Sequence, residues 1–281
     1  MIATEFAYSA PDTLHAALAL LADGAKPLAG GMSLVPMMKL RLAQPEHLVD
    51  LRKVPGLKSI REENGRLHIG ALATHYDIQS SDLVRSLCPL LATTAGKIGD
   101  VQIRNLGTIG GSLAHADPAA DYPAAILALD ATLVLSSTNG QREVAATDFF
   151  VDTFTTAVEP GELLTEIIVS PAPDGARTAY KKMPNPASGF ALVGVAVIAA
   201  KTGGVVSSCR IGVTGVSGKA FRATAAEAKL IGSAGSKADI AEAVKGIAAS
   251  EEANNDIHAS ANYRKAMAEV YAARALESVL L

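Results

Sequence analysis

Two glycine-rich segments carry the residue types that could bind an anionic ligand. The first covers residues 29–33 (AGGMS) and the second covers residues 107–112 (GTIGGS). A glycine pair lets the backbone adopt positive φ and lets a ligand approach with no Cβ in the way. The backbone N–H groups that such a turn exposes can hold a phosphate. Two segments of this kind in one chain indicate a two-sided grip on a diphosphate, so a dinucleotide cofactor is the leading hypothesis.

The first segment lies between an expected strand over residues 26–29 and an expected helix over residues 33–41. In this context a helix N-terminus can face a phosphate. A plain left-handed turn between a strand and a helix is an equally good interpretation. Neither segment matches the GxGxxG or the Walker A pattern.

One acidic residue, Asp121, follows the second segment at the start of an expected helix over residues 122–129. Its carboxylate could accept hydrogen bonds from ribose or ribityl hydroxyls. The alternative is a helix N-cap, a position at which aspartate is preferred. Asp117 precedes a proline and indicates a turn, while His115 has no cysteine, histidine or glutamate near it at metal-ligand spacing. No metal site is therefore predicted.

Four basic residues and one aromatic residue are further candidates. Lys97 and Arg104 lie just before the second glycine segment and could neutralise a diphosphate, or they could be solvated surface charges. Lys181, Lys182 and Phe190 lie later in the chain, where a second domain would face the cofactor. A lysine beside a flavin stabilises the reduced ring, and an aromatic side chain can cover it. The alternatives are a solvated lysine and a core phenylalanine.

The composition excludes several classes of protein. The chain has 281 residues, 49% of them hydrophobic, which is enough for two domains or one large domain. A net charge of −3, with no basic block and no tryptophan, argues against nucleic-acid binding. The two cysteines, Cys88 and Cys209, cannot supply a four-thiolate iron–sulfur cluster. The sequence shows no signal peptide and no apolar run near the ~20 residues of a membrane helix, so we expect a cytoplasmic protein.

The pattern of strands and helices predicts an α+β protein in two parts. We expect a first domain over residues 1–173 and a second domain over residues 174–281. A Pro- and Gly-rich linker at 171–175 separates them. The second domain is expected to hold three antiparallel strands (179–183, 190–200 and 205–213) and three helices (223–231, 237–250 and 259–280). Little periodicity is visible between residues 101 and 118, where the second glycine segment is expected to form a loop.

Three stretches of the chain resemble the FAD-binding medium subunit of the molybdenum hydroxylases. They are residues 28–34 (LAGGMSL), residues 104–121 (RNLGTIGGSLAHADPAAD) and residues 189–196 (GFALVGVA). The resemblance covers essentially the whole chain. It implies a two-subdomain FAD-binding fold of the PCMH/VAO type, with subdomains of about 1–56 and 57–173. An α+β domain with a three-stranded antiparallel sheet would follow, with non-covalent FAD between the domains.

The resemblance also implies which residues bind FAD. The two glycine segments would hold the diphosphate, Asp121 the sugar or ribityl hydroxyls, and Ile98 the adenine side. The backbone of Leu163 or Leu164 would bind the edge of the isoalloxazine, with Lys181 near the ring and Phe190 shielding it. The implied set is Ala29, Gly30, Gly31, Met32, Ser33, Leu34, Ile98, Gly107, Thr108, Ile109, Gly110, Gly111, Ser112, Asp121, Leu163, Leu164, Lys181 and Phe190.

Two features of the glycine segments shape this expectation. Met32 occupies a position that is often polar in the family, so only its backbone could bind a phosphate. We also expect that a Cβ at Gly31 or at Gly110 would occupy the space the diphosphate needs. No residue is assigned a catalytic role.

The resemblance implies a function in electron transfer. A large partner would carry the molybdenum cofactor and a small partner two [2Fe–2S] clusters, in a dimer of heterotrimers, and this chain would pass electrons from its FAD to an external acceptor. One alternative is a free-standing FAD-dependent oxidase of the same broader fold. Another is a non-catalytic nucleotide-binding assembly module.

Replacing Phe190 tests the predicted shielding of the flavin. We expect Phe190→Ala to alter the absorption and fluorescence of the bound flavin and to raise its reactivity with oxygen, because one face of the ring becomes open. Spectra and stopped-flow reoxidation of the purified protein measure both effects. An unchanged spectrum with an unchanged reoxidation rate would assign Phe190 to the core instead.

Overall fold

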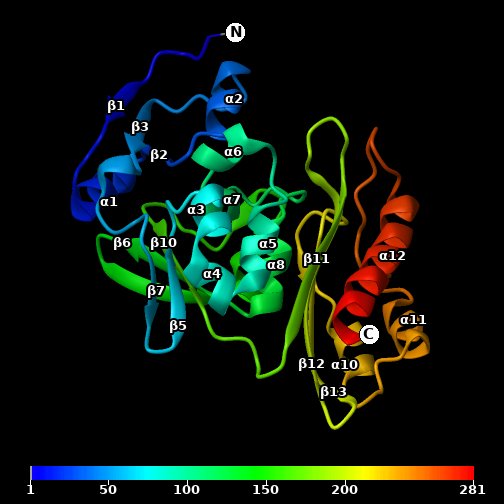
Figure 1. The fold of residues 1–281 in the computed structure, drawn as a ribbon. Helices are drawn as coiled ribbons and strands as arrows, with labels where there is room; N and C mark the ends of the chain where they lie inside the picture. Colours follow the sequence, from blue (N-terminus) through cyan, green and yellow to red (C-terminus); the bar gives the residue numbers. More distant parts are fainter. Residues whose placement is uncertain (1) are drawn as a thin grey trace.

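A computed structural model describes residues 2–281 as helices and strands in layers (Figure 1). The N-terminal layer is a small parallel sheet in the order β1-β3-β2, packed with two helices. Its elements are β1 (Ala7–Ser9), α1 (Leu14–Ala22), β2 (Lys26–Leu28), α2 (Leu34–Lys39), β3 (His47–Asp50) and the 3-10 helix η1 (Leu51–Lys53).

The middle of the chain forms an antiparallel sheet in the order β4-β5-β10-β6-β7. Helices between β5 and β6 cover one face of this sheet and share a core with it. The elements are β4 (Ile60–Glu63), β5 (Arg66–Gly70), α3 (His75–Ser80), α4 (Asp82–Leu87), α5 (Pro89–Ala95), α6 (Val101–Leu106), α7 (Ile109–His115), α8 (Tyr122–Leu129), β6 (Thr132–Ser137), β7 (Gly140–Ala145), α9 (Ala146–Phe149), β8 (Phe150–Asp152), β9 (Thr155–Thr156) and β10 (Leu163–Val169).

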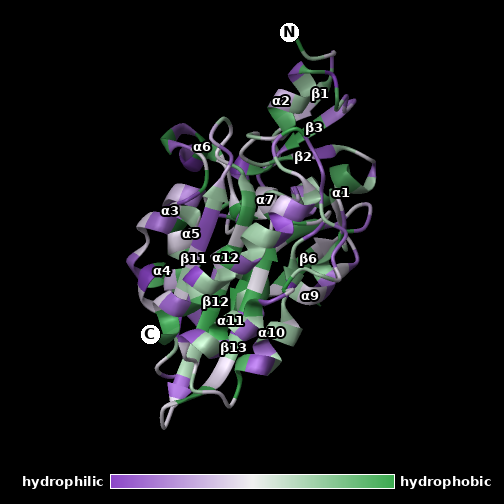
Figure 2. Ribbon diagram, turned by 90° about the vertical axis from the view of Figure 1, so that its right-hand side faces the viewer, coloured by the Kyte–Doolittle hydropathy of each residue, from purple (hydrophilic) through white to green (hydrophobic). Residues whose placement is uncertain are grey.

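The C-terminal part is a second antiparallel sheet, in the order β11-β12-β13-β14, with helices on its far side (Figure 1). The residues of β12 from Ala191 to Ala200 are all buried, because both faces of the strand are covered. Figure 2 shows the hydrophobic residues concentrated along β12 and β13 in the middle of the molecule. The elements are β11 (Arg177–Pro184), β12 (Ala191–Thr202), β13 (Val205–Thr214), β14 (Phe221–Arg222), α10 (Thr224–Leu230), α11 (Lys237–Val244) and α12 (Ala261–Leu280).

The two faces of the C-terminal sheet contact different cores, as the period-2 alternation of a strand requires. Ala196 and Ile198 belong to the core that also contains α8 and the middle sheet. Val195 and Val197 belong to the core that contains α12. The sheet therefore forms a wall between α8 on one side and α12 on the other.

Three expectations about the elements are wrong. The second glycine segment is not a loop, because Asp100 and Thr108 each cap a short helix through their side chains, and Gly110 lies in the first turn of α7. Six or seven residues are too few for helical periodicity to show in the sequence. The C-terminal sheet has a fourth strand, β14, and α11 ends at Val244, two residues before Gly246 with φ +70°. No helix within residues 2–281 combines the length and hydropathy needed to span a membrane.

Candidate cofactor site

The first glycine segment presents a row of free backbone N–H groups. The N–H groups of residues 30–34 donate no hydrogen bond to any of residues 2–281, and Ser33 at the N-cap of α2 makes no side-chain cap bond. Gly31 has φ +72°, a conformation that favours glycine. Consecutive unpaired N–H groups in such a turn form a concave site for an anion.

Close backbone contact brings the two glycine segments together. A Cβ on Gly30 would overlap the carbonyl oxygen of Leu106, immediately before Gly107. A Cβ on Gly111 would lie 3.7 Å from the Cβ of Ala29. Glycine is required at Gly30 because its neighbour is backbone, which cannot turn aside as a flexible side chain can.

Backbone N–H groups of the second segment already donate hydrogen bonds within the chain. Ile109 N and Gly110 N donate to the carbonyls of Ala73 and Ala71 at 3.0 and 2.8 Å. A Cβ on Gly110 would meet the carbonyl oxygen of Ala71 at 2.7 Å, so the expectation that this space belongs to a diphosphate is wrong. Gly110 lacks a side chain so that α7 can pack against the end of β5. Gly107 N, Gly111 N and Ser112 N also donate within the chain, to Ile103 O, Thr108 Oγ1 and Thr108 O.

A buried histidine that the sequence analysis did not identify supports Gly107. His75 N donates to Gly107 O at 2.9 Å, and a Cβ on Gly107 would lie 2.6 Å from His75 Nε2. The ring is 4% exposed and its Nδ1 lies 3.2 Å from the hydroxyl of Tyr122. Burial, with a smaller effect from Arg104, lowers the pKa of His75 to about 4. His75 is therefore neutral at physiological pH.

A buried guanidinium nitrogen beside the second segment has no partner. Arg104 donates through Nη1 to the carbonyls of Ile98 and Gly99 at 3.0 and 3.1 Å. Its Nε is buried and bonds to none of residues 2–281. An unsatisfied buried donor is costly, and this nitrogen is free to bond to an acceptor that the described residues do not supply. Ile98 itself is half-buried against the main core.

The carboxylate of Asp121 joins the two parts of the chain. It accepts from Tyr180 Oη at 2.5 Å and from Lys182 Nζ at 2.8 Å. Asp121 occupies the N-cap position of α8, but its side chain makes no cap bond to the helix, so capping does not account for the carboxylate. Burial raises the pKa of Asp121, while Lys182 and then Tyr180 oppose this rise. Whether a ribityl hydroxyl also contacts this carboxylate stays a prediction.

The lysine that faces the first part of the chain is Lys182. Lys181 lies on the opposite face of β11, together with Ala179 and Met183, which pack toward the core of α12. This placement does not support the prediction that Lys181 lies near the flavin. Phe190 is 45% exposed, so the interpretation of Phe190 as a core residue is wrong.

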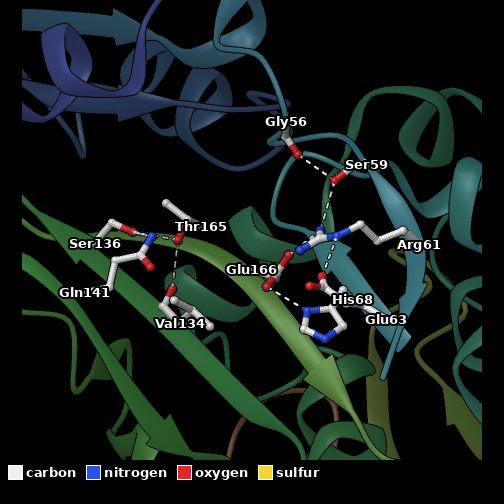
Figure 3. Close-up of polar contacts among 10 residues, drawn as sticks. All are labelled: Gly56, Ser59, Arg61, Glu63, His68, Val134, Ser136, Gln141, Thr165 and Glu166. Atoms are coloured by element: carbon white, nitrogen blue, oxygen red, sulfur yellow. Dashed lines mark hydrogen bonds and ion pairs between the residues drawn. The ribbon is translucent and has the colours of Figure 1, made fainter. Parts of the chain in front are cut away.

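A polar network fixes the strand that carries Leu163 and Leu164 (Figure 3). Thr165 Oγ1 lies 2.8 Å from Ser136 Oγ and 3.2 Å from the carbonyl oxygen of Val134, at the bulge where β10 shifts register against β6. Pairing of β10 with β5 begins only at Glu166, so the backbone of the two leucines has no partner strand on that side. This leaves a strand edge that could bind a planar ligand.

These features are typical of a nucleotide-binding protein. The family model for the FAD-binding domain in molybdopterin dehydrogenase matches residues 4–172, and the model for the CO dehydrogenase flavoprotein C-terminal domain matches residues 178–279. The chain belongs to this family of FAD-binding medium chains of molybdenum-containing hydroxylases. Fold class and cofactor type agree with the sequence-based expectation.

Full-length relatives support the assignment. The carbon monoxide dehydrogenase medium chain of Hydrogenophaga pseudoflava is 42% identical, with 99% of this chain and 98% of the relative covered. The glyceraldehyde dehydrogenase medium chain of Sulfolobus acidocaldarius is 37% identical, with 99% and 100% covered. The solved structure of Hydrogenophaga pseudoflava carbon monoxide dehydrogenase that lacks the Mo-pyranopterin moiety aligns with a TM-score of 0.97 and 44% identity, covering 99% and 98%.

Gly30→Ala should separate the two glycine segments. The added Cβ overlaps the Leu106 carbonyl, and overpacking of this kind costs roughly 1–3 kcal/mol. We expect flavin affinity to fall by at least about tenfold, measured by titration of the purified protein with FAD. In Gly24→Ala, the matched control, the new Cβ meets nothing within 4 Å although φ is +91°. This control should lose only stability, and equal flavin affinity in both variants would contradict the prediction.

His75 should make stability depend on pH. The unfolded chain takes up a proton near pH 6.5 and the folded chain only near pH 4, so the free energy of unfolding should fall as the pH drops through this window. The loss attributable to His75 is about 2 kcal/mol between about pH 7 and about pH 5. Urea denaturation at several pH values should show that the free energy of unfolding of His75→Gln depends less on pH than that of the wild type. The control is the same substitution at the exposed His15, which should keep the pH dependence of the wild type. An unchanged slope in His75→Gln would refute this assignment.

Proposed function

We propose that this chain carries FAD as the electron-transfer subunit of a molybdenum-containing hydroxylase. The observation that carries the proposal is the contact between the two glycine segments, with a row of unpaired N–H groups on one and the unpartnered Arg104 Nε beside the other. These groups fit a diphosphate, which brings several anionic oxygens to a site that lacks acceptors. When bound, FAD supplies the redox chemistry, taking electrons from a partner and releasing them to an external acceptor.

Each part of FAD has a proposed binding group in this chain. The N–H groups of residues 30–34 and the hydroxyls of Thr108 and Ser112 would hold the diphosphate, with Arg104 completing the set. Ile98 would pack on the adenine side. The free backbone edge at Leu163 and Leu164 would bind the isoalloxazine, and Phe190 would cover it. The proposed domain boundary lies at residues 173 and 174, between β10 and β11.

The partners that we propose are a large chain with the molybdenum cofactor and a small chain with two [2Fe–2S] clusters. Within residues 2–281 no group of three or more His, Cys, Asp or Glu side chains could hold a metal ion. Relatives named for carbon monoxide, glyceraldehyde and nicotine match 93% or more of this chain in sequence. Such unlike substrates favour a substrate site on another chain. We further propose a dimer of heterotrimers in the cytoplasm.

Electron transfer from a reduced partner tests the proposal without knowledge of the substrate. The small subunit is reduced with dithionite, freed of excess reductant, and mixed anaerobically with the FAD-loaded chain and the large subunit. We expect the visible absorption of the flavin to bleach, and a small subunit stripped of its clusters should have no effect. Flavin reduction by an organic substrate with this chain alone would favour a free-standing oxidase. Absence of bound flavin would favour an assembly module.

A further inference from the structure

Three polar side chains meet between the two parts of the chain. Asp121 precedes α8, while Tyr180 and Lys182 lie two residues apart on one face of β11. Both oxygens of the Asp121 carboxylate are used, one by Tyr180 and one by Lys182. The side chains of Asp121 and Lys182 are 4% and 5% exposed, and Tyr180 is also 4% exposed. This trio is a buried ion pair with a third, neutral donor.

The ammonium of Lys182 also reaches a third segment. Its Nζ donates to the carbonyl oxygen of Lys97 at 3.0 Å. Lys97 immediately precedes Ile98, whose own carbonyl is held by Arg104. One ammonium therefore fixes β11 to the start of α8 and to the turn between α5 and α6. These two places flank the proposed cofactor site.

The connection between β11 and β12 covers residues 185–190 and ends at the exposed Phe190. A Cβ on Gly189 would lie 3.9 Å from the Cα of Gly99, so this connection approaches the same α5–α6 turn that Lys182 holds. Ala191 N then donates to Ala119 O at 3.0 Å, which ties the far end of the connection to the segment before Asp121.

The C-terminal sheet leaves room for the trio. A Cβ on Gly194, the register partner of Lys182 on β12, would overlap the hydroxyl of Tyr180. A buried ion pair is often no more stabilising than apolar side chains of the same volume. A buried ion pair at this contact therefore acts by specifying a geometry rather than by adding stability, and Gly194 leaves room for that geometry.

We infer that Asp121, Tyr180 and Lys182 form a positioning unit that holds the β11–β12 connection, with Phe190, over the flavin. The inference rests on the proposed function, because the purpose of the positioning is the environment of FAD. These side chains act through the backbone that they hold. Loosening the unit should therefore change the flavin environment beyond any change in stability.

Tyr180→Phe and Lys182→Met loosen the unit to different degrees. Tyr180→Phe removes one hydroxyl and keeps the packing, whereas Lys182→Met leaves a buried carboxylate without its cation. In the assembled complex we expect hydrogen exchange of residues 185–190 and 96–100 to accelerate by about tenfold or more in Lys182→Met, and less in Tyr180→Phe. Reoxidation of the reduced flavin by oxygen should quicken in the same order. Adding Asp121→Asn to Lys182→Met removes both charges and should partly restore protection relative to Lys182→Met.

The matched control is Lys219→Met. Lys219 Nζ also donates to a carbonyl across the two parts of the chain, that of Val151 at 3.0 Å, but away from the β11–β12 connection. This variant should leave both the exchange of residues 185–190 and the flavin reoxidation rate at the wild-type level.

Three results decide the inference. Variants of the trio that match Lys219→Met in local exchange and in reoxidation would overturn it while leaving the proposed function intact. If Lys182→Met unfolds globally, Tyr180→Phe becomes the test. An unchanged reoxidation rate in Tyr180→Phe would then overturn the inference. A wild-type complex without flavin would instead refute the proposed function on which the inference rests.

Discussion

The burial of α8 between the neighbouring helices and the C-terminal sheet is the constraint on which the rest of the structure depends. All eight residues of α8 are buried, and the helix packs against α5, α7 and α9 on one side and against β12, β13 and β14 on the other. A helix that is apolar on every side is stable only when it is covered all round. The glycine at Gly212 permits the closest approach, since a Cβ there would overlap the carbonyl oxygen of Ala124. The two parts of the chain are therefore halves of one packed unit.

The segment that precedes α8 completes this contact with hydrogen bonds. Pro118 O accepts from Gly215 N at 2.9 Å and from Thr214 Oγ1 at 3.0 Å, and Ala120 O accepts from the same hydroxyl at 2.8 Å. Buried carbonyl groups must find donors, and here the donors come from β13 and the residue after it. The end of the stretch 104–121 thus holds the C-terminal domain through Pro118 and Ala120. The earlier residues of the same stretch, Leu106 and Gly111, approach the first glycine segment.

Glycine serves three different purposes in the cofactor region. Gly31 supplies a positive φ, Gly30 permits contact with a neighbouring backbone, and Gly110 permits a helix to pack on the end of a strand. Residues 30–34 of the first segment leave their N–H groups unpaired, whereas most N–H groups of the second segment donate within the chain. Two segments that look alike in sequence therefore differ in the groups that they can offer to an anion.

The sequence alone determined the fold class and most long elements, because strands such as β10 and helices such as α12 have strong local patterns. It also determined the cofactor type, through the two glycine segments and the family resemblance. The tertiary structure decided which partner each polar side chain meets. The sequence indicates Asp121 as a candidate binding residue. Its hydrogen bond with Tyr180 joins residues 59 positions apart, and no local pattern encodes such a contact. The choice between Lys181 and Lys182 likewise depends on which face of β11 meets the first part of the chain and which face meets α12. The role of His75 appears only when α3 is packed against Gly107, because a single histidine in a sequence carries no sign of its burial.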